Sequence, residues 1–120
     1  MTTRLLIVFL SLTVCLSAAV DAKRLLAAIA LVETGNVPKR GNAGETGRHQ
    51  MGIAARKDNR TAENHLAWIR AQLSRLRVDD NAFNIGLAWN AGLTKTVSGK
   101  APVSSYDYAR RVVNIYEATP

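Results

Sequence analysis

Apolar residues recur at helical spacing along most of this chain, and that spacing limits the fold more than any other feature. Thr61 is placed to cap one helix, and Ser104 with Asp107 resembles a capping box at another. No run alternates as a half-buried strand would. The predicted fold class is therefore all-α, or α with a minimal β element. The spacing predicts four helices, over about residues 23–34, 61–77, 81–91 and 105–118.

The N-terminal segment has the pattern of a secretory signal peptide. A basic start ending at Arg4 precedes an apolar run over residues 5–16, and small residues follow. We expect cleavage after Ala19 or Ala22, and therefore a signal peptide over residues 1–22. The product would be exported, to the periplasm or the cell wall, without stable membrane insertion. An uncleaved anchor is the alternative.

Cysteine content and charge limit the remaining chain, residues 23–120. The single cysteine, Cys15, lies in the signal segment, so no disulfide can support the exported domain. About a hundred residues suffice for one domain held by packing alone. The net charge of +7 favours an anionic partner such as a cell-wall polymer. Because the basic residues are scattered and no nucleic-acid motif accompanies them, nucleic acid is not an expected partner. We expect a monomer.

Glu33 is a carboxylate at the apolar side of the first predicted helix. It projects between Leu26 and Ile29, and Gly35 with Asn36 supplies a helix stop directly after it. Burial and the negative end of the helix dipole both disfavour its charge, which predicts a raised pKa. A shift from about 4.3 to about 6 costs roughly 2 kcal/mol of stability, which a general acid would justify. The alternative is a helix-terminal Glu that bends into solvent.

Four short sequence segments are similar to segments of a known enzyme family and occur in the same order along the chain. Together they resemble the catalytic domain of bacterial lytic transglycosylases, in the lysozyme-like superfamily. The resemblance covers residues 25–116, and its strength lies in the order of the segments. The segments are Ile29-Ala30-Leu31-Val32-Glu33-Thr34-Gly35-Asn36, Gly44-Glu45-Thr46-Gly47-Arg48-His49-Gln50-Met51, Ala88-Trp89-Asn90-Ala91-Gly92 and Tyr108-Ala109-Arg110-Arg111-Val112-Val113.

The resemblance implies a lysozyme-like single domain over residues 23–120 and a role for each matched position. Glu33 would be the single catalytic acid and base, acting on peptidoglycan glycan strands without a metal or cofactor. Tyr108 would point its hydroxyl toward Glu33, with Tyr106 as the competing candidate. The implied substrate-binding residues are Gln50, Met51, Trp89, Asn90 and Tyr108.

The implied reaction is non-hydrolytic cleavage of the β-1,4 bond between N-acetylmuramic acid and N-acetylglucosamine, giving 1,6-anhydro ends. Three departures from the family pattern leave alternatives open. Trp89 replaces a common Tyr, the segment after Gln50 lacks a Pro-x-Thr-Ala sequence, and His49 is either a second titrating group or a loop residue. A hydrolase in which Glu45 or a nearby Asp helps to position water, and a non-catalytic wall-binding module, are the alternative functions.

Overall fold

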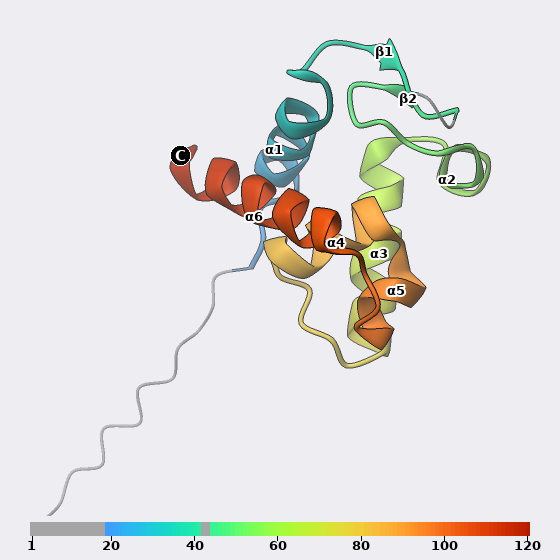
Figure 1. Cartoon of the computed structure of the whole chain (residues 1–120), viewed down its shortest axis with the longest axis vertical. Helices are drawn as coiled ribbons and strands as arrows, with labels where there is room; N and C mark the ends of the chain where they lie inside the picture. Colours follow the sequence, from blue (N-terminus) through green and yellow to red (C-terminus); the bar gives the residue numbers. More distant parts are fainter. Residues whose placement is uncertain (1–18, 42–43) are drawn as a thin grey trace, which may run out of the picture.

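The computed structural model describes residues 19–41 and 44–120, so most of the predicted signal peptide, with Cys15, lies outside the described residues. Figure 1 shows the described part as helices packed around a shared core, with a small hairpin at one side. The helices are α1 (Ala22–Thr34), α2 (Ile53–Asn59), α3 (Ala62–Arg75), α4 (Ala82–Ala91), α5 (Leu93–Ser98) and α6 (Val103–Ala118), and the strands are β1 (Lys39–Arg40) and β2 (Thr46–Gly47).

The predicted fold class, α with a minimal β element, is confirmed. Helices α1, α3, α4 and α6 are the four predicted from apolar spacing, and each begins and ends within two residues of its expected bounds. The spacing did not predict α2, α5 or the hairpin, because none of them is long enough to show a repeat. None of the helices in the described ranges has the length and apolar character needed to cross a membrane.

The predicted caps have different outcomes. Thr61 caps α3 as expected, its hydroxyl accepting a hydrogen bond from the Asn64 amide at 3.1 Å. The capping box at Ser104 and Asp107 is wrong. Helix α6 begins at Val103 behind Pro102, whose φ of −68° already suits a helix start. Asp107 lies within the helix instead and pairs with Arg110 at 2.8 Å.

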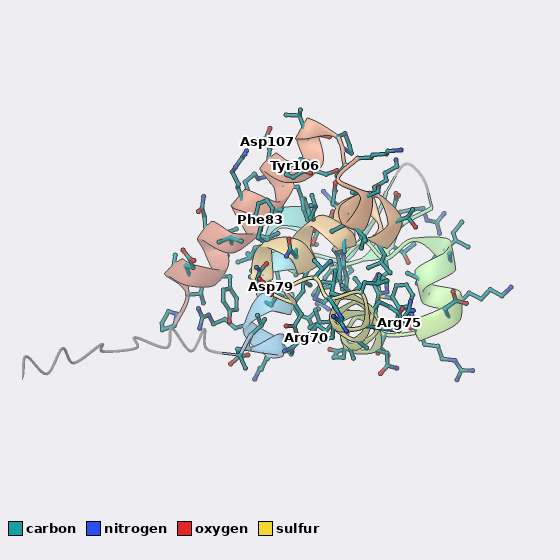
Figure 2. The ribbon with its side chains drawn as sticks, turned by 90° about the horizontal axis from the view of Figure 1, so that it is seen from below. Arg70, Arg75, Asp79, Phe83, Tyr106 and Asp107 are labelled. Atoms are coloured by element: carbon teal, nitrogen blue, oxygen red, sulfur yellow. The ribbon has the colours of Figure 1, made fainter. Side chains whose placement is uncertain are left out.

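The core is built between α1, α3, α4 and α6. Helices α4 and α6 pack most closely, at Gly86, where an ideal Cβ would lie 3.5 Å from Val112 Cβ. On the same pair of helices the Phe83 and Tyr106 rings lie side by side, with centroids 6.2 Å apart (Figure 2). The completely enclosed side chains are mainly aliphatic, as the helical spacing predicts: Leu25, Ile29, Leu66, Ile69, Leu73, Ile85 and Val112.

The hairpin and α2 form a wall beside the helical core. Strands β1 and β2 pair antiparallel, with Lys39 opposite Gly47. The Arg56 guanidinium of α2 donates to Thr46 Oγ1 at 2.6 Å and to the Gly44 carbonyl at 2.9 Å, which ties α2 to the hairpin. This segment, residues 36–60 without 42–43, is called the cleft wall below.

Candidate active site

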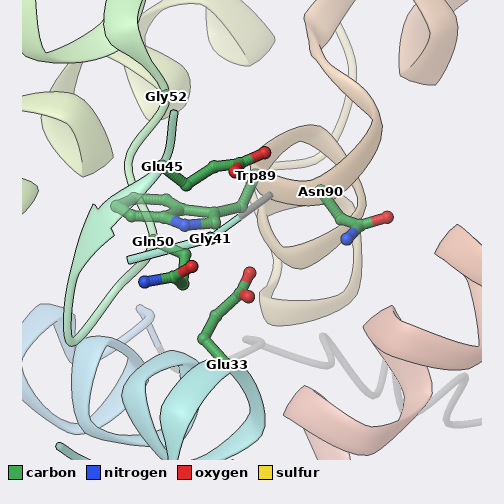
Figure 3. Close-up of a pocket in the computed structure, with 7 residues that line it drawn as sticks. All are labelled: Glu33, Gly41, Glu45, Gln50, Gly52, Trp89 and Asn90. Carbon is green, nitrogen blue, oxygen red and sulfur yellow. The ribbon is translucent and has the colours of Figure 1, made fainter. Parts of the chain in front are cut away.

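A polar cavity of about 450 Å³ lies between the end of α1, the cleft wall and the end of α4. Figure 3 shows the Glu33 carboxyl entering it from α1, with Gln50 and Glu45 on the cleft wall and Trp89 and Asn90 on α4. Four of the six residues that the sequence predicted for the site therefore border one cavity: Glu33, Gln50, Trp89 and Asn90.

The end of α1 places Glu33 at this cavity. Gly35 adopts a left-handed conformation, with φ of 65°, and its amide donates to the Leu31 carbonyl at 3.0 Å. The next amide, of Asn36, donates back to the Ala30 carbonyl at 3.1 Å, which closes the helix. Because the chain turns away immediately after Thr34, nothing in the next turn of helix covers the Glu33 carboxyl.

The pKa of Glu33 is raised above its ordinary value. Desolvation of the half-buried carboxyl is the main cause, and the negative charge of Glu45 adds to it. The Tyr108 hydroxyl and the positive charges of Arg111 and Lys39 act in the opposite direction and limit the shift. The carboxyl therefore holds its proton to a higher pH than an ordinary Glu, which suits a general acid.

Tyr108 does not border the cavity, but its side chain lies near Glu33 and comes from α6. It is 7% exposed, and its hydroxyl is buried. That hydroxyl makes no hydrogen bond of ordinary geometry within the described chain, yet it is near enough to the Glu33 carboxyl for each group to affect the pKa of the other. Burial, then the Glu33 charge, raises the pKa of Tyr108 far above its usual range, so the phenol stays protonated. Tyr106 packs on Phe83 and does not border the cavity.

Gln50 is held on the cleft wall with one amide atom free for the cavity. Its Nε2 donates to the Lys39 carbonyl at 2.7 Å and to the Gly47 carbonyl at 2.8 Å. Its Oε1 lies against Gly41, where an ideal Cβ would approach it to 2.5 Å and Glu45 Oε2 to 2.6 Å. Gly41 is therefore the residue that lets both side chains share this wall, and Gln50 offers an acceptor.

Thr34 connects this wall to the helix that carries the carboxyl. Its hydroxyl donates to the Arg48 carbonyl, 2.9 Å away, and accepts from the Val37 amide at 3.2 Å. The Arg48 Nε donates in turn to the Asn36 carbonyl at 3.2 Å. These side-chain-to-backbone bonds hold the loop that ends in Gln50 against the end of α1, and so they set the position of Gln50 relative to Glu33.

Asn90 is oriented by a buried serine on α6. The Ser105 hydroxyl donates to Asn90 Oδ1 at 2.7 Å, and Ser105 is only 2% exposed. With Oδ1 occupied, the Asn90 Nδ2 is the group left to donate at the cavity. Asn90 and Gln50 thus present complementary groups, a donor and an acceptor, on either side of Glu33.

Ser105→Ala is expected to slow a reaction catalysed at this cavity about tenfold, because Asn90 loses the hydrogen bond that selects its amide orientation. The variant should also lose about 1 kcal/mol of stability. Its turnover and thermal unfolding should be compared with those of Ser104→Ala, an exposed serine one residue earlier. Equal turnover in the two variants would contradict an orienting role for Ser105.

Trp89 lines the cavity and also supports the cleft wall, whereas His49 lies at a different cavity. The Trp89 indole N–H donates to the His49 carbonyl at 2.9 Å, so the indole anchors the cleft wall to α4 as well as lining the cavity. The His49 ring lies at a separate, mostly apolar cavity with Leu26 and Leu66, and burial lowers its pKa. His49 does not border the Glu33 cavity, whereas Glu45 does.

Met51, like Tyr108, is a predicted substrate-binding residue that does not border the Glu33 cavity. Met51 is 7% exposed and packs in the core, and it lines the neighbouring cavity beyond Trp89. Sequence reasoning missed Ser105, Thr34 and Gly41. Ser105 could have been found, because it shares the helical face of Tyr108 and Val112, where a serine is unusual. The other two depend on loop geometry that no local pattern announces.

No group of three or more His, Cys, Asp or Glu side chains able to hold a metal ion occurs within residues 19–41 and 44–120. Comparisons with protein-family models, with curated proteins and with solved structures find no match to this chain. The functional assignment therefore depends on the residues of the site and on their chemistry.

Proposed function

We propose that the chain is an exported lytic transglycosylase that cleaves peptidoglycan glycan strands, with Glu33 as the single general acid and base. The observation that carries this proposal is a half-buried carboxyl of raised pKa in a polar cavity, between the acceptor of Gln50 and the donor of Asn90. The ordered sequence segments that resemble this family supply the same residues. A monomer acting on a wall polymer also agrees with the basic charge.

In the proposed reaction, protonated Glu33 donates its proton to the oxygen between N-acetylmuramic acid and N-acetylglucosamine. The bond from that oxygen to the muramoyl C1 breaks, and the substrate's own N-acetyl oxygen stabilises the positive charge at C1. The Glu33 carboxylate then takes the proton of the muramoyl C6 hydroxyl while that oxygen bonds to C1. The 1,6-anhydro product forms, Glu33 regains its proton, and no water is consumed.

The other groups would support both steps. Asn90 Nδ2 would donate to the substrate N-acetyl oxygen and so align it beneath C1, while Gln50 Oε1 would accept from a sugar hydroxyl or amide. The Tyr108 hydroxyl would approach the Glu33 carboxylate most closely after proton transfer, when the carboxylate is charged. Together with Arg111 and Lys39 it keeps the pKa of Glu33 from rising so far that the group cannot donate.

A hydrolase of the same bond is the second candidate, and Glu45 is the observation that favours it. Glu45 borders the same cavity, and its charge contributes to the raised pKa of Glu33. A second carboxylate in the site is what a water-activating mechanism requires. The two candidates predict different products from the same substrate and the same first step.

Mass spectrometry of the muropeptides released from purified peptidoglycan separates the candidates. A lytic transglycosylase gives ends one water lighter than the reducing ends of a hydrolase. We expect anhydro ends from the wild type and from Glu45→Gln. Removal of the Glu45 charge lowers the pKa of Glu33, so as pH rises the activity of Glu45→Gln should begin to fall at a lower pH than that of the wild type. Reducing ends in the wild type, abolished by Glu45→Gln, would establish the hydrolase instead.

A further inference from the structure

A second cavity, of about 590 Å³, continues the groove beyond Trp89, away from Glu33. The two cavities share Gln50, Gly52, Trp89 and Asn90 on their lining, so a chain-like ligand at Glu33 can extend into the second one. The far side of this cavity is formed by α2 and the first half of α3. None of the residues on that side belongs to the proposed catalytic machinery.

Three aromatic rings run along this cavity. The Trp68 and His65 rings are nearly parallel, at 10°, with centroids 6.0 Å apart. The His65 ring meets Trp89 edge to face, with centroids 4.7 Å apart. Since Trp89 also lines the Glu33 cavity, the rings form a continuous aromatic surface from the catalytic carboxyl to Trp68.

Trp68 is a large aromatic residue that stays partly exposed at this cavity. The buried face of α3 is made by Leu66, Ile69 and Leu73, and Trp68 lies off that face with 43% of its surface exposed. The exposed part of the indole adds nothing to the stability of the fold, and an exposed apolar surface with a polar rim is typical of a binding site. Here the polar rim is supplied by Asp58 and Asn59 at the end of α2.

The ring beside Trp68 is held in place by a hydrogen bond. Asn59 Nδ2 lies 2.9 Å from His65 Nδ1, so with Asn59 donating, the His65 proton resides on Nε2. Burial lowers the pKa of His65, which keeps the imidazole neutral. A neutral ring fixed in this way provides a rigid flat neighbour for Trp68, as expected of a surface that receives a ligand ring.

We propose that this second cavity is a saccharide subsite, in which an N-acetylated hexosamine ring of the glycan strand stacks its C–H face on Trp68 and hydrogen-bonds Asp58 and Asn59 with its polar edge. A pyranose ring has both an apolar face and a polar rim, which matches an indole bordered by a carboxylate and an amide. The proposal rests on the proposed function, because the strand that fills the subsite is the one cleaved at Glu33. The subsite would favour long strands over short ones.

Calorimetric titration of Glu33→Gln with N-acetylglucosamine oligomers tests the subsite without turnover. We expect Glu33→Gln,Trp68→Ala to bind the hexamer about tenfold more weakly than Glu33→Gln, with little change for the dimer. Trp68→Tyr should restore most of the affinity, because it retains a flat ring. Leu76→Ala is the matched control, since Leu76 is a similarly exposed apolar residue at the end of α3, outside both cavities.

Equal hexamer affinity with and without Trp68 would overturn the subsite, provided that thermal unfolding shows both variants folded. The turnover assay on peptidoglycan separates this result from failure of the proposed function. Turnover that requires Glu33, together with Trp68-independent binding, removes only the subsite. Trp68-dependent hexamer binding in a protein without Glu33-dependent turnover keeps the subsite and removes the catalytic proposal.

Discussion

Glu33→Gln is expected to reduce the rate of peptidoglycan cleavage by about 10² to 10⁴-fold, because Gln has no proton to donate to the glycosidic oxygen. The amide is nearly isosteric with the protonated acid, so the shape of the cavity and the binding of the glycan should be retained. The effect should therefore appear in kcat and leave the affinity for oligosaccharides almost unchanged. The measurement is release of soluble muropeptides under saturating substrate.

The same substitution is expected to change stability in a pH-dependent way. The folded pKa of Glu33 is raised, so the wild type loses stability as pH rises from the ordinary value of 4.5 through the folded pKa. Gln does not titrate and avoids this loss. The variant should match the wild type at low pH and exceed it at neutral pH, by about 1 kcal/mol or less because the carboxyl is only half-buried. Urea unfolding at the two pH values measures the difference.

Glu117→Gln is the control for both effects, because Glu117 is exposed on α6 and does not border the cavity. It should retain turnover and show no such gain in stability. If Glu33→Gln retained wild-type turnover, Glu33 would have no part in the chemistry. If it were instead less stable than the wild type at neutral pH, the carboxylate would be the favoured form, contrary to the raised pKa.

Two substitutions at Gly86 are expected to change the stability of the fold in opposite directions. An ideal Cβ there would lie 3.5 Å from Val112 Cβ and Cγ1 and 3.6 Å from Ala109 Cα, which are ordinary contact distances. Gly86→Ala should therefore fit, and should stabilise the fold by about 0.5 to 1 kcal/mol through its higher helix propensity. Gly86→Leu has no such room, and overpacking should cost about 3 kcal/mol.

For a domain of this size these changes correspond to an increase of a few degrees in Tm for Gly86→Ala and a fall of about 12 to 24 °C for Gly86→Leu. Activity should fall when α4 and α6 are pushed apart, because Asn90 lies on one helix and Ser105 and Tyr108 lie on the other. Gly86→Leu should thus lose turnover even below its Tm, whereas Gly86→Ala should keep it. A destabilising Gly86→Ala would show that the two helices are closer than described.

The long helices and the acid could be predicted from the sequence because each depends on a local, repeated signal. Apolar spacing located α1, α3, α4 and α6, and the stop at Gly35 placed Glu33 in the last turn of its helix. Those two facts predicted a raised pKa but left a solvent-exposed Glu as the alternative, and the half-buried carboxyl decides between them. The convergence of Gln50 and Asn90 on the same cavity was expected only from the resemblance in segment order.

The rest of the site depends on contacts between segments distant in the chain, which no local pattern encodes. Ser105 acts on Asn90 across two helices, and Trp89 holds the His49 carbonyl from another element. The exposure of Trp68 depends on how α3 packs, so helical spacing alone could not predict it. The capping box failed for a related reason, since Pro102 sets the start of α6 before Ser104 is reached.

The cleft wall is expected to unfold locally before the helical core does. Among its described residues only Met51 is buried, whereas the helices on the other side of the groove contain the enclosed aliphatic core. Its hydrogen bonds to the rest of the protein are few and include those to Thr34, His65 and Trp89. The amides of this wall should therefore exchange with solvent deuterium through sub-global opening, at lower free energy than those of α3 and α4. Half of the groove would then be a separate cooperative unit, able to release a polymer without unfolding the half that holds the acid.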